Sequence, residues 1–365
     1  MPVPFVDLKR DVADHRDEYI AITARVLDSG VFSLGAEVDA FEKAFAVYLG
    51  VHHAVGVNGG TLALLAAYLA LGVGPGDEVI LPANTFIATA EPVALVGATP
   101  VFCDVDPTTH LLDLASCERL VTPKTKAVVP VHLYGRVAPM DDVLAFAAKH
   151  GLKVIEDAAQ AHGAVLNGKR AGTFGDMGCF SFYPTKNLGA LGEGGAVVTN
   201  DDALAERLRA IRLHGIMKEK YRHDIFGLNL KMDALQAAYL SARITRLDAK
   251  NARRRESAAR YRSGLGNAAE CPADAGDAHV YHLFVIATER RDELQAQLKE
   301  KGIGTGIHYP IPVHLQPSFL KYGGKEGQCP VAESSATRML SLPMFPELTD
   351  AEVDEVIAAV RAFFS

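Results

Sequence analysis

The 365-residue chain lacks any long apolar run. No stretch of about 18 consecutive apolar residues occurs, which is roughly the length that a membrane-spanning helix needs. The first residues, MPVPFVDLKRDV, carry an aspartate and two basic residues where a secretory signal would have an apolar segment. We therefore expect a protein that has no membrane partner.

The chain also has few cysteines, and none of them forms a CxxC motif. The five cysteines are an odd number and lie far apart in the sequence, at Cys103, Cys117, Cys179, Cys271 and Cys329. Such spacing does not suggest a metal site or a redox pair. We interpret them as reduced packing residues of a cytoplasmic protein, and we predict no metal.

Positive charge is not in excess. The chain has 44 acidic and 37 basic residues, a net charge of −7, and its only compact basic run is NARRRES around Arg253. This pattern argues against nucleic acid as the main partner, although a local basic pocket for a phosphorylated small molecule is compatible with it.

Length and apolar content indicate a globular protein with more than one core. A chain of 365 residues exceeds the usual size of a single core, so one large domain and a smaller one are expected, with a cleft between them. Hydrophobic residues make up 49% of the chain and charged residues 22%, which is typical of a folded protein with a substantial core.

Between about residues 52 and 200, short β-rich runs alternate with helical patterns. The runs lie at 52–57, 78–83, 99–105, 126–132 and 153–157, and helical patterns include 61–72, 89–97 and 140–151. This alternation predicts an α/β fold whose mostly parallel sheet is covered by helices on both faces. The runs 177–183 and 194–200 are joined by a loop too short for a crossover helix, so we expect them to be antiparallel neighbours in a mixed sheet.

The C-terminal third has the pattern of a smaller α/β domain. Helical periodicity continues over 232–266, and a strand-like run at 279–288 and a helical pattern at 291–303 follow. The last helix places Val353, Val356, Ile357, Val360, Phe363 and Phe364 on one face. We divide the chain into a large domain over 1–240, with an N-terminal helical segment, and a small domain over 241–365 that is linked to it by a long helix.

Three segments carry residues suited to chemistry. Gly59, Gly60 and Thr61 lie between a strand and a helix, where free N–H groups and the helix dipole favour a phosphate. The signal is weak by itself, because most glycines before a helix only make a turn. Asp157 ends a strand at the edge where ligands bind, and it could pair with a protonated ring nitrogen or merely cap the next segment.

Lys186 directly follows a buried strand and precedes a glycine-rich loop. An amine held there is poorly solvated, which lowers its pKa and makes it a nucleophile toward carbonyl groups, although a surface lysine is the ordinary alternative. A phosphate cradle, a strand-end carboxylate and a reactive lysine are together the parts that hold pyridoxal phosphate. The combination predicts this cofactor, with Lys186 forming the Schiff base and Asp157 keeping the pyridine nitrogen protonated.

Longer motifs extend this prediction over nearly the whole chain. The segments IEDAAQAHGA, SFYPTKNLGALGEGGAVVTN, GPGDEVILPANTFIATAEPVALVGATPVFCDVDP, NLKMDALQAAYL and HYPIPVHLQPSF resemble the DegT/DnrJ/EryC1/StrS family of sugar aminotransferases. The resemblance implies the aspartate aminotransferase fold (fold type I) and a homodimer with active sites at the subunit interface. It also implies transfer of an amino group, with glutamate as the expected donor, to a keto sugar carried on a nucleotide.

The resemblance assigns the cofactor contacts residue by residue. Lys186 is the catalytic lysine that joins the cofactor, and Asp157 is the catalytic partner of the pyridine nitrogen. The other cofactor-binding residues are Gly60, Thr61 and Ser181 for the phosphate, Phe86 for stacking on the ring, Gln160 for the ring hydroxyl, and Asn229 for the phosphate of the neighbouring subunit's cofactor. Core packing for Phe86, a backbone-satisfied hydroxyl for Ser181 and a helix cap for Asn229 are the structural alternatives. The family usually has Asn or Ser where this chain has Gly59, so one phosphate contact could be absent or made by water.

Substrate contacts are a further set of candidates. These are Tyr183, Asn187, Tyr221, His308, Tyr309 and His314, for which ordinary loop roles are the alternative. The run PTKNLGALGEGG resembles family members that act at C3 of the sugar, so a 3-keto sugar linked to dTDP or UDP is favoured. A 4-keto sugar or a keto-cyclitol stays open as acceptor, as does a non-catalytic regulatory protein that binds the cofactor. A sugar dehydratase is disfavoured, because members with that chemistry have histidine at the position of Lys186.

Overall fold

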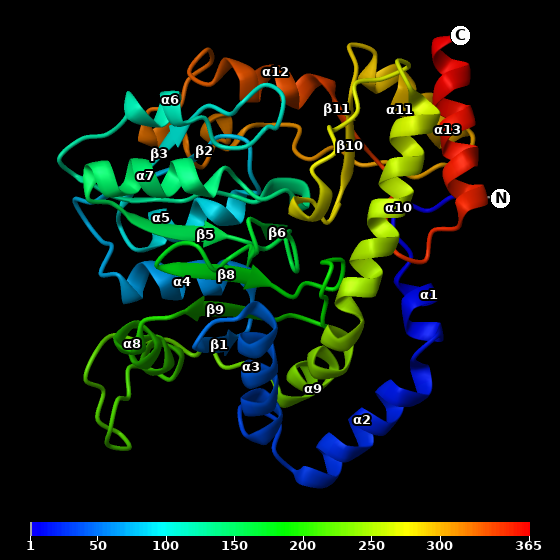
Figure 1. Cartoon of the computed structure of the whole chain (residues 1–365). Helices are drawn as coiled ribbons and strands as arrows, with labels where there is room; N and C mark the ends of the chain where they lie inside the picture. The colour runs from blue at the N-terminus through cyan, green and yellow to red at the C-terminus, as the bar shows by residue number, and fades with distance from the viewer. Residues whose placement is uncertain (1) are drawn as a thin grey trace.

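Short apolar segments form a central sheet in the computed structural model, which describes residues 2–365. The sheet has seven strands in the order β1-β9-β8-β5-β4-β2-β3 (Figure 1). β9 is antiparallel to both of its neighbours, and every other adjacent pair is parallel. The strands are β1 (His53–Val57), β2 (Glu78–Pro82), β3 (Thr99–Cys103), β4 (Thr125–Val128), β5 (Lys153–Asp157), β8 (Met177–Ser181) and β9 (Gly195–Thr199). The predicted mixed, mostly parallel sheet is confirmed, including the antiparallel pairing of β8 with β9.

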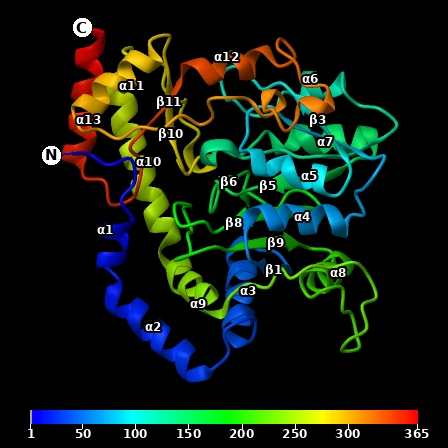
Figure 2. The ribbon, with the colours of Figure 1, turned by 180° about the vertical axis from the view of Figure 1, so that it is seen from behind.

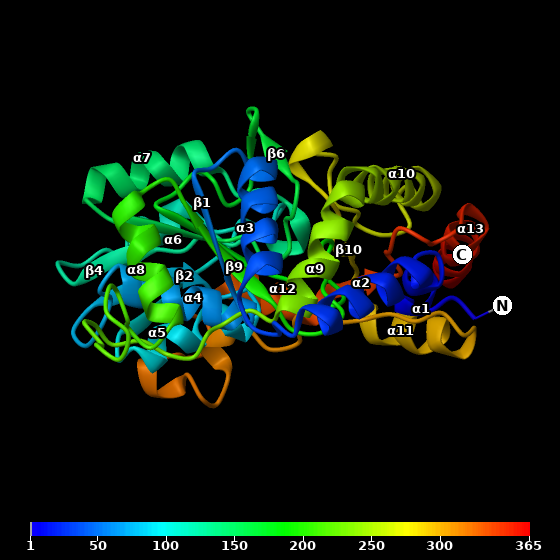
Figure 3. The same cartoon turned by 90° about the horizontal axis from the view of Figure 1, so that it is seen from below.

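Side chains that alternate along each strand explain why helices cover both faces. In β2, Val79 and Leu81 lie in one hydrophobic core and Ile80 lies in another, as the period of two in a strand requires. Figure 3 shows α7 on one side of the sheet and α4 and α5 on the other. One face carries α4 (Gly60–Ala70), α5 (Glu91–Leu95) and α8 (Asp202–Arg212), and the opposite face carries α3 (Ala36–Leu49), α6 (Leu114–Glu118), α7 (Met140–His150) and α9 (Ala234–Arg243).

The C-terminal part of the chain builds a separate hydrophobic core around a small antiparallel sheet. Its elements are α10 (Leu247–Leu265), β10 (Phe284–Ala287), α11 (Arg291–Glu300), β11 (Met339–Leu342) and α13 (Asp350–Phe364), with α12 (Pro330–Arg338) beside them. Figure 1 shows α10 running from the central sheet to α13. The division of domains at residue 240 stays a prediction, and several packing contacts cross it. Val3 packs in the C-terminal core, and Phe319 packs on Phe102 of β3 with ring centroids 5.8 Å apart.

The N-terminal helices form an arm along the outside of α9 and α10 (Figure 2). They are α1 (Leu8–Ala13) and α2 (Arg16–Ser29). Tyr19 of α2 contacts Tyr239 of α9 edge-on, with ring centroids 5.4 Å apart. The shorter elements are β6 (Val165–Leu166), β7 (Lys169–Arg170), η1 (Ile87–Thr89), η2 (Leu133–Gly135), η4 (Gly276–Ala278), η5 (Val313–Leu315) and η6 (Leu320–Tyr322).

The predicted continuous helix over 232–266 is interrupted. A 3₁₀ turn, η3 (Ile244–Arg246), separates α9 from α10. The hydroxyl of Thr245 donates to the carbonyl of Ala242 at 2.8 Å, and such a bond from side chain to backbone competes with the regular helical pattern. α10, the helix that follows this turn, contains the basic run around Arg253. Within residues 2–365, no helix is both long enough and apolar enough to cross a membrane.

The buried carboxylate of Glu156 connects β5 to two neighbouring loops through hydrogen bonds. This carboxylate is fully buried and accepts hydrogen bonds from the N–H groups of Gly172, Phe174 and Gly175 at 2.6 to 2.8 Å. It also lies 2.9 Å from Nε2 of His132. The Nδ1 atom of His132 accepts from the Ala138 N–H, so the ring proton is on Nε2 and the fourth contact is a donor as well.

We expect Glu156→Gln to destabilise the protein strongly. An amide cannot accept four hydrogen bonds, because its NH₂ group would face N–H donors, and each buried group left without a partner costs about 1–3 kcal/mol. Calorimetry should show a lower melting temperature for this variant, whereas Glu326→Gln, at an exposed position, should melt like the unmodified protein. Equal melting temperatures for all three proteins would contradict this account of Glu156.

Candidate active site

A cavity of about 660 Å³ lies at the carboxyl ends of β1, β5 and β8. These strands run parallel to one another, so their last residues meet at one edge of the sheet, where ligands bind in such folds. Most of the predicted site residues line this cavity: Gly60, Thr61, Phe86, Asp157, Gln160, Ser181, Tyr183, Lys186, His308 and Tyr309. The fold therefore brings together residues from all three thirds of the sequence.

The N-terminus of α4 presents free backbone amides to the cavity. Its N-cap, Gly59, supplies no side-chain hydrogen bond, and the first N–H with a partner in the helix is that of Ala63, which donates to the Gly59 carbonyl at 2.9 Å. The N–H groups of Gly60, Thr61 and Leu62 consequently have no acceptor within residues 2–365. A helix end of this kind favours an anion.

A close approach of two backbones places Ser181 beside these amides. A Cβ atom added at Gly60 would lie 2.5 Å from Cβ and 2.9 Å from Oγ of Ser181, so only glycine allows this approach. At Gly59, by contrast, an added Cβ would meet nothing within 4 Å, and the φ of 174° is extended backbone that any residue adopts. The unusual glycine at position 59 thus leaves open space at the helix end.

Asp157 is held by donors on both of its oxygens. The residue is 7% exposed, its Oδ2 accepts from the Thr89 hydroxyl at 2.7 Å, and its Oδ1 accepts from the Ala159 N–H at 3.1 Å. The hydroxyls of Thr89 and Thr85 are 2.7 Å apart. The bond to Ala159 shows that Asp157 does hold the following segment, yet the residue also lines the cavity, so the two alternatives from the sequence are not exclusive.

Lys186 brings an amine into the cavity without any fixed partner. No residue within 2–365 forms a hydrogen bond or an ion pair with its Nζ. Burial lowers the pKa of this amine to about 8, and the nearby carboxylate of Asp157 opposes that shift. A sizeable fraction of the amine is therefore neutral near physiological pH, which is the nucleophilic form.

Phe86, Gln160 and Tyr309 form one wall of the cavity. The side chain of Phe86 is 50% exposed, which is inconsistent with ordinary core packing, and its ring centroid lies 5.6 Å from that of Tyr309. Gln160 accepts from the Tyr134 N–H at 2.6 Å and donates to the Tyr309 hydroxyl at 3.2 Å. Both polar atoms of Gln160 are thus already engaged by protein groups.

Two predicted substrate residues face the protein interior instead. The Nδ2 group of Asn187 donates to Asn251 Oδ1 at 2.9 Å and to the Val280 carbonyl at 3.0 Å. His314 is fully enclosed, and its Nε2 lies 3.0 Å from Glu333. Neither Asn187 nor His314 lines the cavity, and the polar atoms named here hold loops together. A substrate contact by either residue stays a prediction.

Asn229 and Tyr221 lie on the surface, outside the cavity. Asn229 is exposed and its backbone bridges Leu213, and the Tyr221 side chain is 80% exposed. A role across a subunit interface stays a prediction for both residues.

Several polar residues at the cavity or directly behind it were missed from the sequence. Thr85 lines the cavity, whereas Thr89, which donates to Asp157, does not. The segment PANTFIAT offers a signal for this pair, because Thr85 and Thr89 lie four residues apart, on either side of Phe86. His282 and Glu193 also line the cavity. His282 comes from the loop just before β10, and nothing in the sequence shows that this loop faces Lys186.

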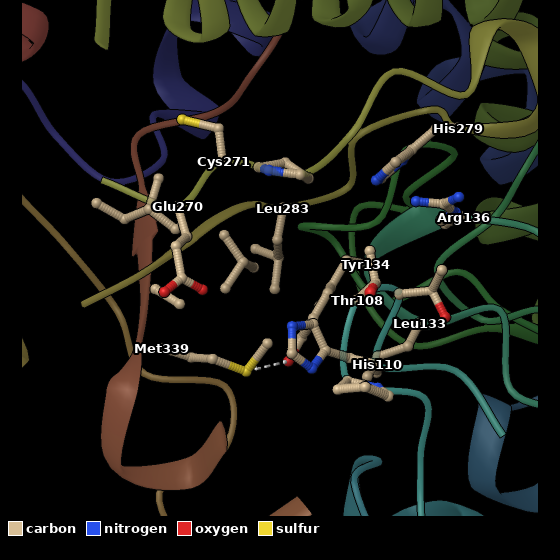
Figure 4. Close-up of a pocket in the computed structure, with 16 residues that line it drawn as sticks. Thr108, His110, Leu133, Tyr134, Arg136, Glu270, Cys271, His279, Leu283 and Met339 are labelled. Carbon is tan, nitrogen blue, oxygen red and sulfur yellow. Dashed lines mark hydrogen bonds between the residues drawn. The ribbon is translucent and has the colours of Figure 1, made fainter. Parts of the chain in front are cut away.

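A second cavity, of about 200 Å³, lies behind the wall of the first and shares Leu283 with it. Figure 4 shows Tyr134 reaching toward Met339 in this cavity. The Tyr134 hydroxyl donates to the His308 carbonyl at 2.5 Å, which ties this wall to the segment that faces Lys186. No predicted site residue lines the smaller cavity.

Comparison with known proteins agrees with this geometry. A model of the DegT/DnrJ/EryC1/StrS aminotransferase family matches residues 13–361. The chain is 49% identical to a dTDP-3-amino-3,4,6-trideoxy-α-D-glucose transaminase of Streptomyces venezuelae, covering 98% of this chain and 95% of that protein. It is 47% identical to a pleiotropic regulatory protein of Geobacillus stearothermophilus, covering 100% and 99%.

Solved structures show the same similarity. The crystal structure of S. venezuelae DesV in complex with a ketimine intermediate has a TM-score of 0.97 and 48% identity, with 100% of this chain and 99% of that chain covered. The structure of NtdA from Bacillus subtilis with bound cofactor PMP has a TM-score of 0.94 and 35% identity, with 100% and 85% covered. The predicted fold is confirmed by these similarities.

We expect Lys186 in the cofactor-free protein to react with an acylating reagent with a midpoint near pH 8, because burial lowers its pKa to about 8. Peptide mapping by mass spectrometry at a series of pH values measures this midpoint. In Asp157→Asn the midpoint should fall, since the carboxylate raises the pKa of the amine. A midpoint near about 10.4, the ordinary value for lysine, would contradict the burial argument.

Proposed function

Because this chain belongs to the DegT/DnrJ/EryC1/StrS aminotransferase family, we propose that it binds pyridoxal phosphate through Lys186 and transfers an amino group from an amino acid to a keto sugar carried on a nucleotide. One observation carries the proposal. A single cavity joins the free amides of α4, the strand-end carboxylate of Asp157 and an amine whose pKa is lowered to about 8.

The residues present fit the proposed cofactor. The free N–H groups at the start of α4, with the hydroxyls of Thr61 and Ser181 nearby, suit a phosphate, and a Cβ at Gly60 would fill that cradle. Asp157, held by the Thr89 hydroxyl and a backbone N–H, offers a carboxylate to a protonated ring nitrogen. The half-exposed ring of Phe86 provides a face for stacking. The structure of NtdA with bound PMP supports the same class of cofactor.

Lys186 has two tasks in this function. When bound, pyridoxal phosphate supplies a sink for the electron pair that remains when a proton leaves the donor's α-carbon. Lys186 holds the cofactor covalently and, once displaced by the donor, its amine takes that proton. A pKa of about 8 suits the second task, because the amine can both accept and return a proton near neutral pH.

The proposed role of Asp157 is electrostatic and does not involve the bonds that break or form. Its carboxylate holds a proton at the ring nitrogen, which keeps the ring able to accept electrons. Since Thr89 and Ala159 each donate to one of its oxygens, the carboxylate is oriented before any ligand binds. The Thr85–Thr89 hydroxyl pair extends this support into the core.

The proposed acceptor is a 3-keto sugar on dTDP or UDP, with glutamate as donor. The support is the similarity to a dTDP-3-amino-sugar transaminase at 49% identity and the resemblance of the segment after Lys186 to enzymes that act at C3. A 4-keto sugar or a keto-cyclitol is the alternative acceptor.

The proposal includes a homodimer with shared sites. Asn229 and Tyr221 lie outside the cavity of their own chain, which agrees with a role toward a partner's cavity. Their loop also exposes Phe226, whose side chain is 95% exposed, with Met217 and Leu228 nearby. Clustered exposed apolar side chains are typical of a surface that another protein covers.

A regulatory protein that binds the cofactor without turnover is the second candidate, and the similarity to a pleiotropic regulatory protein supports it. Glutamate distinguishes the two. The visible absorbance of the cofactor-loaded protein should bleach when glutamate is added to an aminotransferase, and it should persist in a protein without turnover.

We expect Lys186→Ala to lose both the cofactor absorbance and the bleaching by glutamate, because no other lysine among residues 2–365 lines the cavity. Asp157→Ala should retain part of the cofactor, but its bleaching rate should be lower by about 10²-fold or more. The loss of one electrostatic contact to a developing charge has an effect of this size. Stopped-flow absorbance measures both rates. Normal bleaching in Lys186→Ala would refute the assignment of the lysine.

Gly60→Ala and Gly59→Ala form a matched pair for the phosphate cradle. An added methyl at Gly60 would collide with Ser181, whereas one at Gly59 has open space. We expect Gly60→Ala to weaken pyridoxal phosphate binding by about tenfold or more, on the order of 1.4 kcal/mol, and Gly59→Ala to bind nearly normally. Absorbance titration of the cofactor-free variants gives both dissociation constants. Equal loss in the two variants would place the phosphate elsewhere.

A further inference from the structure

His282 lines the cavity, yet no part of the proposed function uses it so far. It lies on the loop before β10, is 8% exposed, and its Nδ1 is 3.3 Å from Asn187 Oδ1. The buried Asn187 beside it belongs to a chain of hydrogen bonds that ends on two backbone carbonyls. This chain determines which nitrogen of His282 carries the proton.

The orientation of both asparagine amides follows from those carbonyls. The Val280 carbonyl can only accept, so the Asn187 atom 3.0 Å from it is the NH₂ group. In the same way the His162 carbonyl, 2.8 Å from Asn251, requires the NH₂ group of that side chain. Asn251 therefore turns its Oδ1 toward Asn187, whose NH₂ donates to it at 2.9 Å.

The oxygen of Asn187 then remains for His282. An amide oxygen only accepts, so the Nδ1 atom of His282 must be the donor and must carry the ring proton. The Nε2 atom is left with a lone pair. This Nε2 atom has no hydrogen-bond partner within residues 2–365. The fully buried polar atoms without a partner do not include it, so Nε2 is accessible from the cavity that His282 lines.

The ring of His282 stays neutral in this position. Burial lowers its pKa well below the ordinary value, and the charges of Lys186 and Arg254 lower it further. His308 also lines the cavity, but its hydrogen-bond partner does not fix the position of its ring proton. Its Nδ1 lies 2.8 Å from the Ser341 hydroxyl, which can donate or accept, so the tautomer of His308 is not determined.

We propose that Asn187 is a positioning residue, which holds His282 with its proton on Nδ1, and that Nε2 of His282 accepts a hydrogen bond from a hydroxyl of the bound sugar. The second half of this proposal rests on the proposed function. Carboxylates and phosphates only accept hydrogen bonds, whereas a sugar hydroxyl can donate one, so a lone pair in this place suits a hydroxyl of the proposed acceptor. Asn187 thus influences substrate binding through His282 without contacting the substrate.

The tautomer can be tested without any substrate. Nitrogen-15 NMR of the histidine-labelled, cofactor-loaded protein distinguishes a protonated from an unprotonated ring nitrogen, and the signals of His282 are those missing in His282→Asn. We expect Nδ1 protonated and Nε2 unprotonated in the unmodified protein, and a loss of this preference in Asn187→Leu. A proton on Nε2 in the unmodified protein would overturn the positioning role.

The hydroxyl contact is tested by a variant that preserves the hydrogen-bond chain. In His282→Asn, the side-chain NH₂ can still donate to Asn187, but no atom reaches the position of Nε2. Isothermal titration with two probes separates the sugar from the nucleotide: dTDP-3-amino-3,4,6-trideoxy-α-D-glucose, whose sugar ring keeps one hydroxyl, and dTDP alone. We expect about three- to tenfold weaker binding of the sugar nucleotide and unchanged binding of dTDP, with an unchanged melting temperature.

Three results would count against the contact. Equal binding of the sugar nucleotide by His282→Asn and the unmodified protein would refute it, and an equal loss for both probes would indicate a structural effect. If the unmodified protein bound neither probe, the proposed acceptor class and the hydroxyl contact would both be wrong. The NMR result would still decide the tautomer, so failure of the positioning role and failure of the proposed function are distinguishable.

Discussion

The active-site cavity depends on one electrostatic balance, between the desolvation of the Lys186 amine and its attraction to Asp157. Burial lowers the pKa of the amine and the carboxylate opposes that effect, and the resulting pKa is about 8. An amine in this range can be both a nucleophile and a proton carrier near neutral pH. The surrounding structure maintains the balance, because it partly buries Lys186 and keeps Asp157 in a fixed orientation.

Sheet topology provides this arrangement. The parallel direction of β1, β5 and β8 brings the start of α4, Asp157 and Ser181 to one edge. The loop that carries Lys186 stays at this edge, because it joins the end of β8 to the start of the antiparallel β9. Polar groups outside the cavity then orient those inside it. Thr89 fixes the carboxylate of Asp157, and Asn187 fixes the ring of His282.

Much of the fold and the centre of the site were predictable from sequence, because they depend on local patterns. Apolar runs of about five residues followed by helical periodicity predicted the sheet, and the position of Lys186 between a strand and a glycine-rich loop drew attention to a residue that lines the cavity. The predicted residues that lie outside the cavity have a common feature. Asn187 and His314 are polar residues near the motif segments, but whether a side chain points into the cavity or into the protein depends on which loops pack against it, and those loops are distant in sequence. The break at η3 was missed because the helical pattern of the sequence continues through it.

The sequence by itself determined the alternation of strands and helices, the glycines that permit close backbone contact, and the residue types at the cavity edge. Only the tertiary structure decided which of these residues share a cavity and in which state they are held. Proton positions and pKa values are set by burial and by partners from other segments, such as Val280 and Asn251 for Asn187. These partners come together only when the chain has folded, so no local pattern encodes them.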